Sequence, residues 1–155
     1  MVTHSRRVAV LDDDIRFIRL VERILGTEDI EIQPVTTLDI EEARRVIAES
    51  GCQAAIVDVY MYGDASGFRL VERLRRDPDL AELPIIVASG ARREIGRRVE
   101  FLQAHRCTVL LKPFGADELI AKVHSIEGFG AVAAQETPAE PVSGAAETAT
   151  RTMDG

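Results

Sequence analysis

The sequence predicts an α/β fold in which a doubly wound, five-stranded parallel sheet carries helices on both faces. Short apolar runs recur at regular spacing, and stretches with helical periodicity lie between them. A strict alternation of strands and helices is typical of parallel sheets, because parallel neighbours need crossover connections, which are nearly always right-handed. The absence of tryptophan and the aromatic content of 5% agree with an aliphatic core.

The predicted strands are short, and four of the five are nearly continuous in apolar character. Such continuity is typical of strands that are covered on both faces, as in a parallel sheet. The runs are Val8 to Leu11, Ile30 to Val35, Ala54 to Val59, Ile85 to Ala88 and Val109 to Leu111. Ligands of such sheets bind at the carboxyl ends of the strands, so we expect the chemistry at the residues that close each strand.

The predicted helices carry apolar residues three and four positions apart, which places those residues on one face. Asp39 or Thr37 is expected to cap the second helix. Gly26 and Gly51 follow helix ends, and one helix follows each strand. The expected core-facing residues are Ile15, Ile18, Val21 and Leu25, then Ala43, Val46 and Ile47, then Phe68, Val71 and Leu74, then Ile95, Val99 and Leu102, and finally Leu119, Ile120 and Val123.

The length of 155 residues suits one ordinary domain and a tail. From Gly128 onward the composition shifts to Ala, Thr, Glu, Pro and Gly without a periodic apolar face. We therefore expect one domain over residues 1–127 and a disordered tail over residues 128–155. An output domain for DNA binding or catalysis does not fit after Ile126, which favours a stand-alone domain that signals through protein contacts.

Charge and cysteine usage narrow the function classes. The formal net charge is −7, so direct binding to nucleic acid is not expected. Cys52 and Cys107 lack metal-type spacing and are expected to be reduced thiols in a reducing compartment. The N-terminus has no apolar signal core, and no run of about 18 apolar residues occurs, so we expect a cytoplasmic protein without a membrane partner.

Charged or reactive side chains stand at four of the predicted strand ends. They are Asp12, Asp13 and Asp14 after the first strand, Asp58 near the end of the third, Ser89 at the fourth, and Lys112 followed by Pro113 at the fifth. Clustered carboxylates repel one another unless a cation neutralises them, and hard oxygen ligands suit a magnesium-type ion. A lysine and a hydroxyl group beside such an ion fit a phosphoryl site, where an aspartate can form an aspartyl phosphate.

Four motifs contain these residues and follow one another along the chain. They are Val8-Ala-Val-Leu-Asp-Asp-Asp14, Ala55-Ile-Val-Asp58, Leu83-Pro-Ile-Ile-Val-Ala-Ser89 and Leu111-Lys-Pro-Phe114. With them, the stretch from Arg6 to Ile126 resembles the receiver domains of response regulators, the CheY-like proteins of two-component signalling systems. The resemblance implies a flavodoxin-like sheet with the strand order 2-1-3-4-5.

The resemblance also implies a role for the residues of the phosphoryl site. Asp58 would be the phosphoacceptor, Lys112 would pair with phosphoryl oxygens, and Ser89 would bind a further oxygen. A cis peptide bond before Pro113 would direct the Lys112 side chain inward.

For the metal, the resemblance implies a Mg²⁺ site formed by the acidic residues. Asp13 and Asp58 would be direct ligands, and Asp12 would bind mainly through water. The backbone carbonyl of Tyr60 would complete the shell. Asp14 is instead interpreted as an acid at a helix N-terminus, where the helix dipole stabilises it.

The function implied is that of a response regulator. A histidine kinase or phosphotransfer protein would donate its phosphohistidine phosphoryl group to Asp58 in a Mg²⁺-dependent reaction. The protein would not be an enzyme acting on other substrates, because it would catalyse only its own phosphorylation and dephosphorylation. The change would reach a downstream protein target, or a second copy of the chain in a homodimer, through the face formed by the fourth helix, fifth strand and fifth helix.

Several positions depart from the family's pattern. Val109 stands where most receivers carry a Tyr or Phe whose rotamer changes on phosphorylation, and an aliphatic side chain has no ring to reorient. The loop after Asp58 lacks the usual proline and is one residue longer than is typical. Tyr60 and Ala91 occupy positions that modulate the access of water in this family, so an unusual phosphoryl lifetime is expected.

Two other functions compete with this interpretation. A haloacid dehalogenase-like phosphatase would use the Asp12-Asp13-Asp14 run, but that family's hydroxyl and lysine precede a later acidic pair, whereas Asp58 precedes both here. A degenerate receiver that binds partners without phosphorylation is the second alternative, favoured by Val109 and the altered loop. The fourth helix carries an arginine-rich face, which is expected to be a solvated face rather than the alternative, a docking surface for an acidic partner. Its residues are Arg92, Arg93, Arg97 and Arg98.

Overall fold

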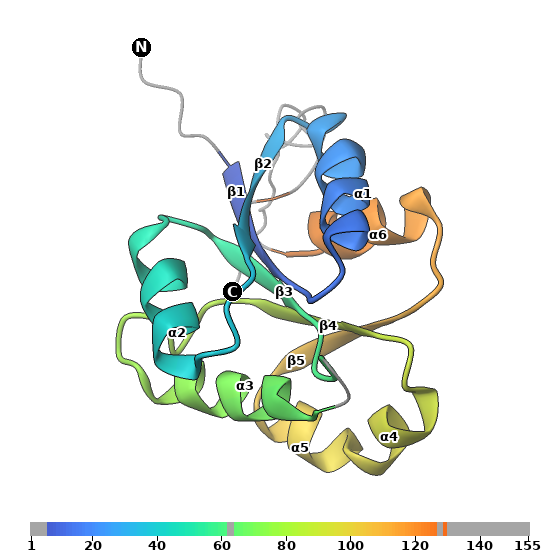
Figure 1. The fold of residues 1–155 in the computed structure, drawn as a ribbon. Coiled ribbons are helices and arrows are strands. Elements are labelled where there is room, and N and C mark those ends of the chain that lie inside the picture. Colours follow the sequence, from blue (N-terminus) through green and yellow to red (C-terminus); the bar gives the residue numbers. More distant parts are fainter. Residues whose placement is uncertain (1–5, 62–63, 127–128, 130–155) are drawn as a thin grey trace, which may run out of the picture. The chain divides into compact units, whose positions relative to one another are not determined.

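The computed structural model describes residues 6–61, 64–126 and 129 of the chain (Figure 1). The chain forms two units, Met1–Lys122 and Val123–Gly155, and the sheet and the site belong to the first. Apart from Phe129, the tail expected over residues 128–155 lies outside the described residues, so the domain boundary at residue 127 stays a prediction. Within the described residues, every helix is too short or too polar to span a bilayer.

A five-stranded sheet with all strands parallel forms the centre of the first unit (Figure 1). The strand order is β2-β1-β3-β4-β5, so the predicted doubly wound sheet and the order implied by the resemblance are confirmed. The strands are β1 (Arg6–Leu11), β2 (Ile30–Val35), β3 (Ala54–Val57), β4 (Ile85–Ser89) and β5 (Cys107–Leu111). Every residue of β3 and β4 is buried, as their continuous apolar character predicts.

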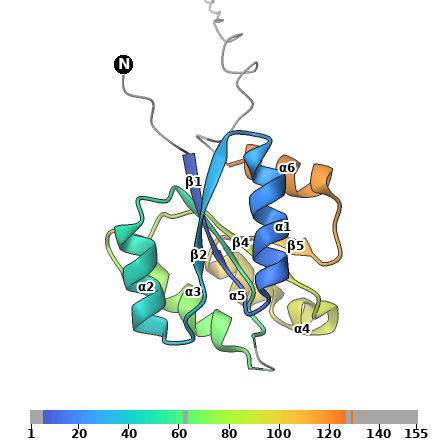
Figure 2. The same cartoon turned by 45° about the horizontal axis from the view of Figure 1, so that its top comes forward.

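Helices cover both faces of this sheet. Figures 1 and 2 show α1 and α6 on one face and α2, α3 and α5 on the other. Asp39 caps α2 by accepting a hydrogen bond from the backbone N–H of Glu42, so Asp39 rather than Thr37 is the N-cap. The helices are α1 (Ile15–Gly26), α2 (Ile40–Glu49), α3 (Ser66–Arg76), α4 (Arg92–Arg97), α5 (Val99–Ala104) and α6 (Ala116–His124).

The prediction of one continuous fourth helix is wrong, because the chain forms two short helices there. Arg98, with φ −112° and ψ 20°, is not helical and separates α4 from α5. Gly96 lies two residues before this break and lowers the helix propensity of the segment. Ile95 and Leu102 are buried as predicted, but Val99 is 45% exposed, since the break changes the helical phase after Ile95.

Two more residues differ in burial from the expectation. Ile15 is 49% exposed because it is the first residue of α1, and the buried face of that helix begins at Ile18. Arg98 is half-buried, and its guanidinium lies 4.3 Å from the ring centroid of Phe68, so it does not belong to the solvated arginine face. The other three arginines of that face are exposed as predicted.

Candidate functional site

Two of the predicted acidic residues follow strands that are neighbours in the sheet. Leu11 at the end of β1 pairs with Val57 at the end of β3, so the next residue on each strand is an aspartate. Asp12 is 2% exposed and Asp58 is 7% exposed, whereas Asp13 is exposed. Carboxylate oxygens of these three aspartates lie within 4.8 Å of one another. The structure therefore brings the predicted acidic residues into one cluster.

Lys112 reaches this cluster from the end of β5, two strands away from β3. Its Nζ lies 2.8 Å from Oδ2 of Asp12 and 3.2 Å from Oδ2 of Asp58. The cis peptide bond expected before Pro113 is present. The lysine thus forms hydrogen-bonded ion pairs with both buried carboxylates, one from each of the neighbouring strands β1 and β3.

The charges in this cluster are not balanced. Burial raises the pKa of Asp12 and of Asp58 above the ordinary value, although Lys112 opposes the rise in both. Burial alone would lower the pKa of Lys112, but its hydrogen bond to Asp12 and the charges of Asp58 and Asp12 outweigh burial and raise that pKa. Lys112 pairs with the two buried carboxylates, so these three groups carry one excess negative charge when all are ionised, and Asp13 places a third carboxylate beside them.

Oxygen donors and excess negative charge fit a divalent cation of the magnesium type. The residues that could hold it are Asp12, Asp13 and Asp58, whose carboxylate oxygens are close enough to share one ion. The backbone carbonyl of Tyr60 as a further ligand stays a prediction. A bound Mg²⁺ would supply positive charge beside Asp58, which the single lysine provides only in part.

Ser89 closes β4, which lies between the strands that carry Asp58 and Lys112. Its side chain is buried, and its Oγ accepts a hydrogen bond from the backbone N–H of Ala91 at 3.1 Å. Its backbone carbonyl accepts a hydrogen bond from the backbone N–H of Lys112 at 2.9 Å. Ser89 therefore lies at the predicted edge of the sheet, while its binding to a phosphoryl oxygen stays a prediction.

The chain around Asp58 is held by local hydrogen bonds. The backbone N–H of Tyr60 donates to Oδ1 of Asp58 at 2.9 Å, which restrains the carboxylate from the loop side. Asp14 lies outside the cluster and is the N-cap of α1, where its side chain accepts from the backbone N–H of Arg16. The interpretation of Asp14 as a helix N-terminal acid is confirmed.

Gly67 is a site-supporting residue that the sequence reasoning missed. A Cβ atom at this position would lie 2.3 Å from Cα of Val59 and 2.5 Å from the backbone oxygen of Asp58. The backbone N–H of Gly67 donates to the carbonyl of Val59 at 3.2 Å, so the first turn of α3 touches the backbone of the loop that follows Asp58. A glycine in the first turn of a helix, where its propensity is poor, is the signal that could have indicated this close approach.

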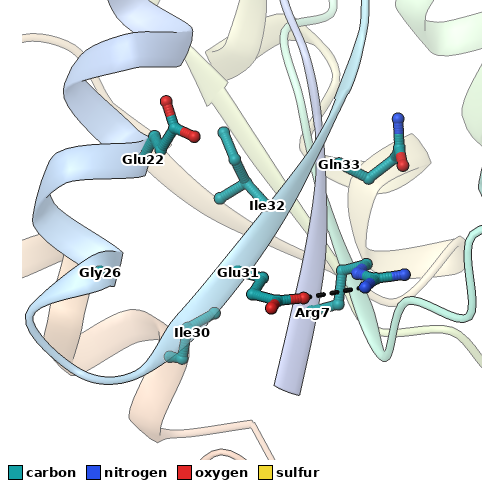
Figure 3. Close-up of a pocket in the computed structure, with 7 residues that line it drawn as sticks. All are labelled: Arg7, Glu22, Gly26, Ile30, Glu31, Ile32 and Gln33. Atoms are coloured by element: carbon teal, nitrogen blue, oxygen red, sulfur yellow. Dashed lines mark hydrogen bonds and ion pairs between the residues drawn. The ribbon is translucent and has the colours of Figure 1, made fainter. Parts of the chain in front are cut away.

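A hollow of about 460 Å³ lies at the β2 edge of the sheet and contains none of the predicted site residues (Figure 3). Figure 3 shows a dashed line that joins the side chains of Arg7 and Glu31, two of its lining residues, and this ion pair measures 2.8 Å. The lining residues are Arg7, Glu22, Gly26, Ile30, Glu31, Ile32 and Gln33. Because this hollow lacks the carboxylate cluster and Lys112, the chemistry belongs to the strand ends and not to it.

A smaller apolar hollow of about 230 Å³ adjoins the acidic cluster through Lys112. The Nζ of Lys112 lies 4.0 Å from the ring centroid of Phe17, a cation–π distance. The Phe17 ring in turn meets the edge of Phe114, with the centroids 5.9 Å apart. The hollow is lined by Phe17, Leu20, Lys112, Pro113 and Phe114.

Comparisons with known proteins identify the family of this chain. A family model described as the response regulator receiver domain matches residues 8–124. Regulatory protein VirG of Agrobacterium fabrum is 29% identical over 118 residues, which cover 76% of this chain and 44% of that protein. Transcriptional regulatory protein PrrA of Mycobacterium tuberculosis is 33% identical over 136 residues, covering 86% of this chain and 56% of that protein. The chain spans about half the length of these curated relatives.

Solved structures resemble the chain over the same region. The chemotaxis response regulator CheY4 of Vibrio cholerae has a TM-score of 0.67 at 22% identity, covering 79% of this chain and 98% of that chain. At this identity the likeness shows a common fold. The family model covers most of the chain, and the strand-end residues of the four motifs lie together at one edge of the sheet. The chain belongs to the response regulator receiver domain family of two-component signalling systems.

Proposed function

We propose that this receiver accepts a phosphoryl group on Asp58 from the phosphohistidine of a histidine kinase or phosphotransfer protein, in a Mg²⁺-dependent reaction. The observation that carries the proposal is the position of the Asp58 carboxylate, which is buried beside Asp12 and Asp13 and lies 3.2 Å from the Lys112 ammonium group. Asp12 makes contacts of the same kind, with Lys112 at 2.8 Å and with the backbone N–H of Asp14 at 2.9 Å. Asp58 is the proposed acceptor because it follows β3, the strand whose motif resembles the phosphoacceptor strand of receivers.

The chemistry follows from these contacts. A carboxylate oxygen of Asp58 forms a bond to phosphorus while the phosphorus–nitrogen bond of the donor breaks, and the imidazole nitrogen keeps the bonding electron pair. Lys112 then pairs with the transferred phosphoryl oxygens, and the Ser89 hydroxyl donates a hydrogen bond to another. These groups are fixed in position, so they stabilise the negative charge on the phosphoryl oxygens more effectively than water does.

The same arrangement supports regulation rather than turnover of external substrates. In our proposal the protein is not an enzyme for other molecules, since it catalyses only its own phosphorylation and the later hydrolysis of its aspartyl phosphate. The output is a protein contact with a downstream target or with a second copy of the chain. Because PrrA carries the name of a transcriptional regulator and this chain matches only 56% of its length, transcriptional control by a longer protein is a second candidate output.

Intact-mass spectrometry tests the acceptor chemistry. Wild type incubated with acetyl phosphate and Mg²⁺ is expected to gain about 80 daltons, the mass of one phosphoryl group on a carboxylate. The gain should disappear without Mg²⁺ and in Asp58→Asn. Asp14→Asn is the matched control, because it replaces an aspartate outside the cluster with an equally good N-cap and should keep the gain.

Rapid hydrolysis of the aspartyl phosphate is separated from a missing reaction by beryllofluoride, a phosphoryl mimic that does not hydrolyse. Binding of beryllofluoride to wild type in the presence of Mg²⁺, detected by ¹⁹F NMR, would keep the proposal when no stable mass adduct is seen. If neither the adduct nor beryllofluoride binding occurs, the chain is a degenerate receiver that acts as a phosphorylation-independent binding module.

A further inference from the structure

The family's usual reporter of phosphorylation is missing at position 109, so a link between Asp58 and the α4–α5 segment would have to run through other residues. Val109 lies on β5, is half-buried and packs against the aliphatic core. Its short branched side chain has few rotamers and cannot move a large ring between a buried and an exposed position.

Tyr60 makes such a link with its own backbone and side chain. Its backbone N–H donates to Oδ1 of Asp58 at 2.9 Å, and its phenolic hydroxyl donates to Oε1 of Glu94 at 3.0 Å. Glu94 belongs to α4, and it lies 34 residues along the chain from Tyr60. One residue therefore touches the phosphoacceptor at one end and the first turn of α4 at the other.

Aromatic contacts extend this link to the break between α4 and α5. The Tyr60 ring meets Phe68 edge to face, with the centroids 5.6 Å apart, and Phe68 meets Phe101 of α5 in the same manner at 5.3 Å. The guanidinium of Arg98 lies 4.3 Å from the Phe68 centroid and 6.0 Å from the Phe101 centroid. Since Arg98 separates the two helices, the ring contacts reach the place where the segment can bend.

We propose that the Tyr60–Glu94 contact couples the state of Asp58 to the conformation of the α4–α5 segment, Arg92–Ala104, in place of an aromatic residue at position 109. The inference rests on the proposed phosphorylation of Asp58. A phosphoryl group on Asp58 changes which carboxylate oxygens can accept from the Tyr60 N–H, and Tyr60 follows the acceptor by only two residues. A shift of its backbone moves the phenol against Glu94, and α4 and α5 adopt a second arrangement.

The test compares the response of this segment in variants that leave the acidic cluster unchanged. Glu94→Ala removes the acceptor of the phenol, and Glu94→Gln restores an oxygen at the same distance. Arg97→Ala is the matched control, because it removes the 2.7 Å ion pair of Glu94 with Arg97 while leaving the Tyr60 contact in place. Amide hydrogen exchange of residues 92–104 is measured with Mg²⁺, with and without beryllofluoride.

In wild type we expect beryllofluoride to change the exchange rates of this segment. The change should fall about fivefold in Glu94→Ala, as expected for the loss of one partly exposed hydrogen bond, and should persist in Glu94→Gln and Arg97→Ala. Binding of beryllofluoride itself, followed by ¹⁹F NMR, should be retained in all three variants.

The outcomes separate the coupling from the function on which it rests. If wild type binds beryllofluoride and Glu94→Ala shows the same change in exchange as wild type, or if the wild-type segment does not respond, the coupling is overturned and the acceptor function stands. If wild type neither binds beryllofluoride nor gains a phosphoryl group, the proposed function fails and the coupling fails with it.

Discussion

Two regions of the first unit contain partly or fully buried charged side chains, and the two regions differ in the partners that the fold gives to these charges. One is centred on Arg75, near the C-terminal end of α3, and the other is the carboxylate cluster with Lys112. Arg75 is half-buried, and its guanidinium donates hydrogen bonds only to neutral backbone carbonyls in the contacts that the structure describes. These carbonyls belong to Ala81, Leu83, His105 and Arg106.

The Arg75 cluster is complete without any ligand. Burial lowers the pKa of Arg75, but a guanidinium remains charged at neutral pH, and its hydrogen bonds join the segment before β4 to the turn before β5. The carboxylate cluster is incomplete, because Lys112 is one positive charge between the two buried carboxylates of Asp12 and Asp58. This difference distinguishes a structural charge from a functional one. A structural charge has all its partners in the fold, whereas a functional charge needs a partner from outside.

The largest expected effect is on the structural charge. Arg75→Met should lower the free energy of unfolding by about 3 kcal/mol, because three part-buried carbonyls lose their donors at once. Urea unfolding measures this loss, and Arg76→Met, at an exposed neighbour, should change stability by less than about 0.5 kcal/mol. Equal effects of the two substitutions would show that the hydrogen bonds of Arg75 do not stabilise the fold.

The next effect concerns the backbone that holds the acceptor. Gly67→Ala should destabilise the fold by about 2 kcal/mol, because the added Cβ would overlap with the backbone of Val59 and Asp58. Gly96→Ala is the control and should have the opposite effect. Nothing lies within 4 Å of a Cβ atom at position 96, and alanine favours a helix more than glycine does, so this substitution should stabilise α4 by about 0.5 kcal/mol. Thermal unfolding of both variants measures the two changes in stability. If Gly67→Ala leaves the stability unchanged, the loop after Asp58 can move away from the added Cβ without destabilising the fold.

Removing a functional charge should stabilise the fold. Because burial raises the pKa of Asp58 in the folded state, its ionised carboxylate opposes folding, and Asp58→Asn should add about 1 kcal/mol at neutral pH without Mg²⁺. The gain is complete above the raised folded pKa and disappears as the pH falls below the ordinary pKa, where the group is protonated in both states. Urea unfolding at neutral and acidic pH measures it, and a loss of stability at neutral pH would contradict the assignment.

The last effect, of similar size, is the response to the metal. Mg²⁺ at several times its dissociation constant should stabilise wild type by about 1 kcal/mol, since it binds the folded cluster. The stabilisation should be lost in Asp13→Asn, which removes an exposed carboxylate of the cluster. It should be unchanged in Arg75→Lys, measured by thermal unfolding, because Arg75 lies outside the cluster. Stabilisation that persists in Asp13→Asn would show that the ion binds elsewhere.

Much of the site could be predicted because it depends on local sequence patterns. Continuous apolar runs located the strands, and the parallel arrangement placed Asp12, Asp58 and Lys112 at one edge of the sheet. The break at Arg98 could not be predicted from periodicity, since Ile95, Val99 and Leu102 keep helical spacing across it. Local propensity alone does not decide whether a weak helical segment bends.

The sequence by itself determined the alternation of strands and helices and the residues that stand at the strand ends, because both follow from patterns within a few neighbouring residues. The tertiary structure decided which distant groups meet. The contact of Tyr60 with Glu94 and the approach of Gly67 to the backbone of Asp58 depend on how α3 and α4 pack beside the acceptor loop. Such contacts join residues whose spacing along the chain has no period, so only packing brings them together.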